Sequence, residues 1–205
     1  MLGNDVIDLA DPETWPGACH PRFAARVFTP VERATIAASP RPACTRWVHW
    51  AAKESAYKAA RQRAPATVFA PQRFVVRLAG ASSRPTLGDV RHGSDRFRLR
   101  VVLGHDVIHA IAWDPEATGV LVADVGRLDA AATPAQLSAA ARALAVRMIG
   151  RALGVADTRL AVVRVAGSPP RLLRDGHPAD AAVSLSHHGQ LVAFACLLPR
   201  TGDVE

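Results

Sequence analysis

WAAKESAYKA, the stretch from Trp50 to Ala59, contains the only two lysines of the chain, Lys53 and Lys58. The other 23 of the 25 basic residues are arginines. Glu54 and Lys58 are four residues apart, and an exposed ion pair between them would accept arginine equally well. Lysine differs from arginine because it is a compact charge whose pKa can fall far enough for it to act as a base. The stretch is therefore either a surface ion pair or part of a site that requires lysine.

Two helices are predicted in the first half of the chain. Thr29 can cap a helix that has Pro30 at its first position and Glu32 as the partner in a capping box, and this helix should end before Pro40. The second helix is expected over about residues 45–62. Its tryptophan, glutamate and second lysine, spaced i, i+4 and i+8, lie on one face.

Apolar and β-branched runs predict strands in both halves. In the first half these are LGNDVIDL (2–9), QRFVVRL (72–78), RFRLRVVL (96–103) and DVIHAIAW (106–113), with turns such as AGASSRP (79–85) between them. In the second half these are GVLVADV (119–125), LAVVRV (160–165), VSLSH (183–187) and QLVAFACLL (190–198). A second capping box, TPAQ (133–136), predicts a helix that ends at Gly154.

A short internal repeat relates the two halves. VVLGHDVIHAIAW (101–113) parallels VSLSHHGQLVAFAC (183–196), and VADVGRL (122–128) can be laid on GNDVIDL (3–9), with Asp124 opposite Asp5. Repeats this short also arise by chance. If the repeat is genuine, it predicts an α+β fold of two lobes, residues 1–118 and 119–205, related by a pseudo-twofold axis with a site between them.

Charge and cysteine content limit the class of protein. The formal net charge of +7 and the pI near 10.5 favour an anionic partner. The basic residues are scattered and aromatic residues are few, which argues against nucleic acid as that partner. Three cysteines without CxxC spacing indicate reduced thiols. With neither a signal peptide nor an apolar run long enough for a membrane span, we expect a soluble cytoplasmic protein.

Three acids are candidates for a metal site. Asp5 and Asp8 lie on the first predicted strand and Glu54 lies on the second predicted helix. Mg²⁺ binds one or two carboxylates together with waters and substrate phosphates, so a strand-borne Asp and a helix-borne Glu could meet at such an ion. Asp5 could equally be a turn or cap residue. Asp8 is the weaker candidate, because residues three apart on a strand point to opposite faces.

The segment SLSHHG predicts an anion site where a strand runs into a turn. Ser184, Ser186, His187 and His188 supply hydroxyl and imidazole groups there, beside free backbone N–H groups. A polar hairpin turn is the alternative interpretation. The adjacent histidines lack a third ligand at zinc spacing, and the absence of a GxSxG elbow disfavours a serine hydrolase.

Together these motifs resemble the 4′-phosphopantetheinyl transferase superfamily. Its GxD strand, WxxKE(S/A)xxK helix and SxSH motif read here GND (3–5), WAAKESAYK (50–58) and SLSH (184–187), and its FxxxE helix start reads FTPVE (28–32). The second half resembles the first lobe of the two-lobed, surfactin-synthetase type, but the motifs stand in the order of the small holo-acyl-carrier-protein synthases. The resemblance therefore implies a two-lobed monomer with its lobes exchanged along the chain.

The resemblance also implies an activity, with coenzyme A and Mg²⁺ as cofactors. Such enzymes transfer phosphopantetheine from coenzyme A to a serine of an apo acyl or peptidyl carrier protein and release 3′,5′-ADP; the two-lobed type leans toward secondary metabolism. By this resemblance Asp5 and Glu54 hold Mg²⁺, and Lys58 neutralises charge or deprotonates the serine, with Glu54 or a metal-bound water as the competing base. His187 and Ser186 bind a phosphate of coenzyme A. Lys53 contacts substrate or pairs structurally.

Several positions depart from the family pattern. Ile7 stands where the two-lobed type often has a second acid, so Asp8 is the remaining candidate for a third carboxylate. The family's GKP reads GSP (167–169), and Arg171 or Arg174 is expected to replace the missing lysine. In the first repeat LGH replaces LSH, so His105 is taken as a structural relic. Two alternatives stay open: a non-catalytic homologue that binds coenzyme A or a carrier protein, and a small basic nucleic-acid-binding protein.

Overall fold

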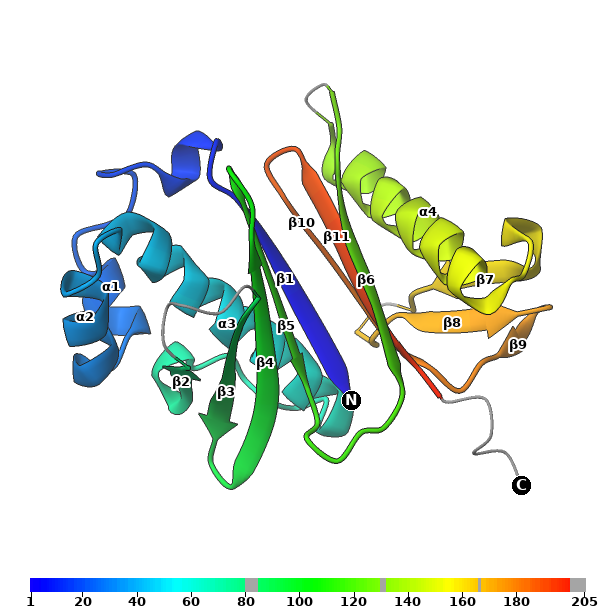
Figure 1. Ribbon diagram of the computed structural model, residues 1–205, viewed down its shortest axis with the longest axis horizontal. Coiled ribbons are helices and arrows are strands. Elements are labelled where there is room, and N and C mark those ends of the chain that lie inside the picture. The colour runs from blue at the N-terminus through cyan, green and yellow to red at the C-terminus, as the bar shows by residue number, and fades with distance from the viewer. Residues whose placement is uncertain (80–84, 130–131, 166, 200–205) are drawn as a thin grey trace.

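The computed structural model describes residues 1–79, 85–129, 132–165 and 167–199, and it is an α+β protein with three sheets (Figure 1). The first sheet is antiparallel and has the order β1-β5-β4-β3-β2. Its strands are β1 (Leu2–Asp8), β2 (Phe74–Leu78), β3 (Thr86–His92), β4 (Asp95–Leu103) and β5 (Val107–Trp113). Helices α1 (Phe23–Val27), α2 (Pro30–Ala37) and α3 (Pro42–Arg63) precede β2, and α3 packs on β1 and β5.

The second lobe has a three-stranded sheet covered by one long helix. The sheet has the order β10-β11-β6, with β6 (Val120–Arg127), β10 (Ala182–His188) and β11 (Leu191–Leu198). Helix α4 (Pro134–Leu153) packs on it and ends at Gly154, whose φ of 64° is the left-handed C-cap conformation. A third, small sheet contains β7 (Leu160–Val163), β8 (Arg171–Arg174) and β9 (His177–Pro178).

The two larger sheets repeat one topology. In the first lobe the elements β1, α3, β4 and β5 come in this order along the chain, with β2 and β3 between α3 and β4, and the strands lie in the order β1-β5-β4. In the second lobe β6, α4, β10 and β11 come in the corresponding order, with β7, β8 and β9 between α4 and β10, and the strands lie in the order β6-β11-β10. Asp5 of β1 pairs with Ala110, and Asp124 of β6 pairs with Phe194. The chain passes from the first sheet to the second between β5 and β6, which is where residue 118 lies.

The local predictions differ from the structure at several places: helix α1 and strands β3, β8 and β9 were not predicted, and α3 begins earlier than predicted. Helix α3 begins at Pro42, three residues before the predicted start, because a proline is accepted at the first helical position. Strand β3 was not predicted, because its sequence TLGDVRH contains glycine and aspartate, which are rare in strands. It lies between β2 and β4, where paired neighbours outweigh its weak propensity. Residues 80–84 of the predicted turn lie outside the described residues.

Strand β1 lies at the seam between the lobes, beside β10 and β11 (Figure 1). Its side chains alternate. Leu2 and Val6 pack against apolar residues of the second lobe, whereas Asp5 points toward α3. Residues of both lobes therefore meet along this single strand. None of the described helices is long and apolar enough to span a membrane.

Candidate functional site

Asp5, Glu54 and Lys58 meet where α3 crosses β1. The ammonium group of Lys58 donates to Asp5 Oδ1 at 2.7 Å and to the carbonyl oxygen of Asn4 at 3.0 Å. Burial raises the pKa of Glu54 to about 7; the charge of Asp5 adds to this rise and the charge of Lys58 opposes it. The structure thus brings together the strand-borne Asp and the helix-borne Glu that the sequence singled out, with the lysine beside them.

The pair Asp5 and Glu54 fits a hard divalent cation. In the described part of the chain Glu54 has no hydrogen-bond partner, so its oxygens are available to a ligand. Two nearby carboxylates repel each other, and a cation between them would relieve that repulsion. Among the described residues no group of three or more His, Cys, Asp or Glu side chains could hold a metal ion. The donor set is therefore two carboxylates, which leaves positions for phosphate oxygens and water.

Asp8 does not supply the third carboxylate, which corrects that expectation. Both of its oxygens accept hydrogen bonds from Arg127 of β6 at 3.0 Å, and they also accept from the amides of Gln190 and Ala10. Burial alone would raise the pKa of Asp8, but these hydrogen bonds and the charge of Arg127 outweigh it and the pKa is lowered. Asp8 faces the second lobe because it lies three residues from Asp5 on a strand.

Lys53 does not reach the candidate site, so the alternative that it contacts coenzyme A is wrong. Its side chain is fully buried, and its ammonium group donates to both oxygens of Glu32 at 2.8 Å and to the carbonyls of Pro71 and Phe74. All three of its protons are thus used inside the first lobe. Glu32 in turn completes the capping box with Thr29. Of the two roles left open for Lys53, the structure shows the structural pairing.

The SLSH motif lies on β10, against the same part of β1. Ser184 Oγ accepts from the backbone N–H of Asn4 at 2.9 Å, and Ser186 Oγ accepts from Asn4 Nδ2 at 3.1 Å. His187 is exposed, and its pKa is lowered by partial burial and by the charge of Lys58, with Asp5 opposing. The motif therefore adjoins the carboxylates although about 180 residues separate them in the chain.

Two residues of this cluster were missed from the sequence. Asn4 is the middle residue of GND, a position that the family motif leaves variable. His109 of β5 lies 3.1 Å from Asn4 Nδ2, and burial, followed by the charges of Lys58 and Arg100, lowers its pKa to about 4. Nothing in the sequence marks His109, because it occupies a position in an apolar strand.

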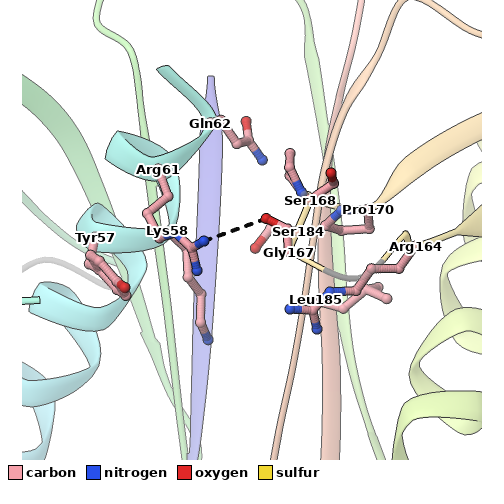
Figure 2. Close-up of a pocket in the computed structure, with 11 residues that line it drawn as sticks. Tyr57, Lys58, Arg61, Gln62, Arg164, Gly167, Ser168, Pro170, Ser184 and Leu185 are labelled. Atoms are coloured by element: carbon pink, nitrogen blue, oxygen red, sulfur yellow. Dashed lines mark hydrogen bonds between the residues drawn. The ribbon is translucent and has the colours of Figure 1, made fainter. Parts of the chain in front are cut away.

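A pocket of about 200 Å³ opens next to Lys58, between α3 and the second lobe (Figure 2). Arg61 extends into it from α3, and Arg164 and Ser184 line it from the second lobe. Arg61 donates to the carbonyl of Gly167 at 3.5 Å. Arg61 follows Lys58 at i+3, so helical spacing could have identified it. Arg164 has no such signal.

Arg171 is exposed on β8 and does not line this pocket. Arg174 is the last residue of β8, next to the turn that leads into β9, and it does not line the pocket either. The pocket therefore gives no support to the expectation that one of these arginines replaces the missing lysine of GSP. The cations that the pocket offers are Lys58, Arg61 and Arg164. His105, expected to be a relic, is exposed and contacts Asp106.

Comparison with protein families agrees with this geometry. The model of the 4′-phosphopantetheinyl transferase superfamily matches residues 1–112, more than half of the chain. The chain belongs to this superfamily. The match spans the strand and the helix that carry Asp5, Glu54 and Lys58, whereas SLSH lies beyond it.

The other two comparisons add a structure but no curated sequence. Among solved structures, the holo-[acyl-carrier-protein] synthase of Thermotoga maritima matches with a TM-score of 0.37 and 15% identity, covering 86% of this chain and 83% of that chain. A comparison with curated proteins found no match.

Proposed function

We propose that this protein transfers 4′-phosphopantetheine from coenzyme A to a serine of an apo carrier protein. The observation that carries the proposal is the meeting of Asp5, Glu54 and Lys58 at the seam, in a member of this superfamily. The strand β10, which lies beside β1, carries Ser186 and His187. An ion pair on a solvated helix face would not gather these groups from two lobes.

The reaction requires positive charge around a pyrophosphate. The serine oxygen attacks the phosphorus that bears the pantetheine, the bond to the bridging oxygen breaks, and 3′,5′-ADP leaves. Asp5 and Glu54 would hold Mg²⁺, which supplies charge neutralisation on the phosphate oxygens when bound. Lys58 lies beside Asp5, to which it donates a hydrogen bond. From this position its positive charge would neutralise negative charge on the leaving group.

The serine proton must leave as the new bond forms. Lys58, or an oxygen of Glu54 that the cation leaves free, would accept this proton; Glu54 has no hydrogen-bond partner in the described part of the chain. Arg61 and Arg164, which line the pocket, would bind the pyrophosphate of coenzyme A, and His187 and Ser186 of β10 would bind its 3′-phosphate.

The carrier protein would be an acidic partner. Carrier proteins of this kind are usually acidic around the modified serine, and the net charge of +7 would speed the encounter. Since each lobe repeats one topology and the seam joins them within one chain, we propose that the protein acts as a monomer.

The test is intact-mass spectrometry of apo carrier proteins incubated with this protein, coenzyme A and Mg²⁺, with an EDTA control. Fatty-acid, polyketide and peptide-synthetase carriers should be compared. We expect a metal-dependent gain equal to one phosphopantetheine group. Binding of coenzyme A without any gain on all three carriers would favour the non-catalytic homologue. Absence of binding would contradict the proposal.

A further inference from the structure

Asn4 uses its polar groups to join the candidate site to the second lobe. Its backbone N–H donates to Ser184 Oγ, and its carbonyl accepts from Lys58 Nζ. Its side-chain amide contacts Ser186 Oγ and His109 Nε2, both at 3.1 Å. The residue is fully buried and directly precedes Asp5. Asn4 therefore contacts the SLSH strand, the helix lysine and β5 at once.

The hydrogen-bond roles in this cluster can be assigned by counting donors. Asn4 Nδ2 carries two hydrogens, and it faces one hydroxyl oxygen and one imidazole nitrogen. With the amide in this orientation His109 Nε2 is the acceptor and the ring is neutral, while Asn4 Oδ1 has no hydrogen-bond partner among the described residues. The neutral ring agrees with the His109 pKa of about 4, lowered by burial and by the charges of Lys58 and Arg100. Both amide hydrogens of Asn4 are thus committed to fixed partners.

We infer that Asn4 is a positioning residue that sets Ser186 and His187 at the correct distance from Asp5 and Lys58. This inference rests on the proposed function, because coenzyme A would span both groups. Its pyrophosphate would lie beside Asp5 and Lys58 of the first lobe, and its 3′-phosphate would lie beside Ser186 and His187 of the second. A ligand held at both ends binds tightly only when the two anchoring points keep their spacing.

The contact between the lobes at this point depends on side chains. Strand β1 pairs with β5 along one edge, and its other edge faces β10 without a backbone ladder. The N–H groups of Leu2, Asn4 and Asp8 instead donate to side chains, those of Gln62, Ser184 and His188. Within this arrangement, the Asn4 amide is the side chain of β1 that holds Ser186. Its removal should let the SLSH strand shift relative to Asp5.

The experiment compares coenzyme A with 3′-dephospho-coenzyme A, which lacks the phosphate assigned to Ser186 and His187. Dissociation constants of both compounds are measured by calorimetry with Mg²⁺ for the wild type, Asn4→Ala and Asn4→Leu. The wild type should prefer coenzyme A. In Asn4→Ala this preference should fall about tenfold, because the hydrogen bonds to a charged phosphate lose their geometry. Binding of 3′-dephospho-coenzyme A should change little.

Thr14→Val is the matched control. Thr14 is also buried, and its hydroxyl donates to the carbonyls of Leu9 and Asp11 within the first lobe. Its variant should lose stability but keep the preference for coenzyme A, which separates positioning from general destabilisation. Asn4→Leu keeps the branched shape and the number of side-chain heavy atoms, and it replaces Asn4→Ala in the comparison if that variant does not fold.

The outcomes distinguish the inference from the function on which it rests. If the wild type transfers phosphopantetheine and both Asn4 variants keep the full preference, the inference is overturned and the proposed function stands. If the wild type shows neither transfer nor a preference for coenzyme A, the proposed function fails and the inference fails with it. An equal loss of preference in Thr14→Val would also overturn the inference.

Discussion

The two lysines of the chain are five residues apart on α3, which places them about 140° apart around the helix axis. Lys53 is fully buried and paired with Glu32, whereas the side chain of Lys58 is 30% exposed and contacts Asp5. The composition suggested that this stretch could be part of a site that requires lysine. It could not separate the two roles, because only the helix phase decides which lysine faces β1.

Replacement of Lys58 by arginine tests whether the compact charge matters. Lys58→Arg keeps the charge, but a planar guanidinium cannot reproduce the single nitrogen that donates to both Asp5 and the Asn4 carbonyl. We expect kcat to fall about 100-fold, measured as 3′,5′-ADP release. Arg147→Lys, an exposed position on α4, is the control and should be neutral. Wild-type activity in Lys58→Arg would remove the reason proposed for lysine at this position.

The raised pKa of Glu54 predicts how stability depends on pH without metal. Because burial and Asp5 raise the folded-state pKa to about 7, folding favours the protonated form. Stability should therefore fall as pH rises from the ordinary value of 4.5 through 7, and stay low above that. Mg²⁺ should raise Tm more at pH 8 than at pH 5.5. In Glu54→Gln, both the fall in stability with pH and the rise in Tm with Mg²⁺ should disappear. Thermal unfolding with and without EDTA measures both. A Mg²⁺ effect that persists in this variant would contradict the metal site.

At the scale of elements, the local sequence signals were the reliable ones. The capping boxes of Thr29 with Glu32 and of Thr133 with Gln136 are both present at the predicted helix starts. These signals are local because they need only residues three apart. Strand β3 has no such signal, and only its neighbours β2 and β4 determine its conformation.

The close approach of β1 to α3 depends on Gly3. A Cβ at this position would overlap the carbonyl oxygen of Ser55 and lie 2.6 Å from the amide nitrogen of Ala59, both backbone atoms of α3. Gly3→Ala should therefore lower the free energy of unfolding by about 3 kcal/mol, as expected for overpacking against a backbone that cannot give way. Urea unfolding measures it. Gly104→Ala is the control, since its Cβ would meet only Val107 at ordinary contact distance; equal losses would show that the contact is not specific.

The pair Lys53 and Glu32 joins α3 to α2 inside the first lobe. Lys53→Met would leave the Glu32 carboxylate buried without its cation, which should cost about 3–5 kcal/mol of unfolding free energy. Adding Glu32→Gln removes the unpaired charge, so the double variant should lose less than the sum of the single variants. Urea unfolding of all four proteins completes the cycle. Additive losses would show that the two side chains do not stabilise each other.

At the scale of the molecule, the sequence predicted the components of the site but not their assembly. Asp5, Glu54 and the SLSH motif could be found because each belongs to a short pattern. The contacts that join the lobes, such as Asp8 with Arg127 and Gln62 with the Val183 carbonyl, link residues 119 and 121 positions apart. No local pattern marks such pairs, so Asp8 was taken as a candidate metal ligand although it is an interlobe contact.

Removal of Arg127 tests this contact between the lobes. Asp8 is only 3% exposed, so Arg127→Met would leave its carboxylate buried with two backbone donors in place of four hydrogen bonds. We expect the free energy of unfolding at pH 7 to fall by about 2 kcal/mol, measured with urea.

The pH dependence of that loss follows from Asp8. Burial raises its pKa, but the hydrogen bonds from Arg127, Gln190 and Ala10 outweigh burial and lower the pKa below the ordinary value of 3.8. A carboxyl with a lowered folded-state pKa adds stability above its unfolded pKa and loses it as pH falls through the folded one. The difference between wild type and Arg127→Met should therefore be full at pH 7 and shrink toward pH 3. Arg159→Met removes an exposed pair with Asp175 and should change stability little at either pH. A loss in Arg127→Met that is equal at both pH values would mean that Arg127 contributes packing, and that Asp8 does not hold the lobes together through its charge.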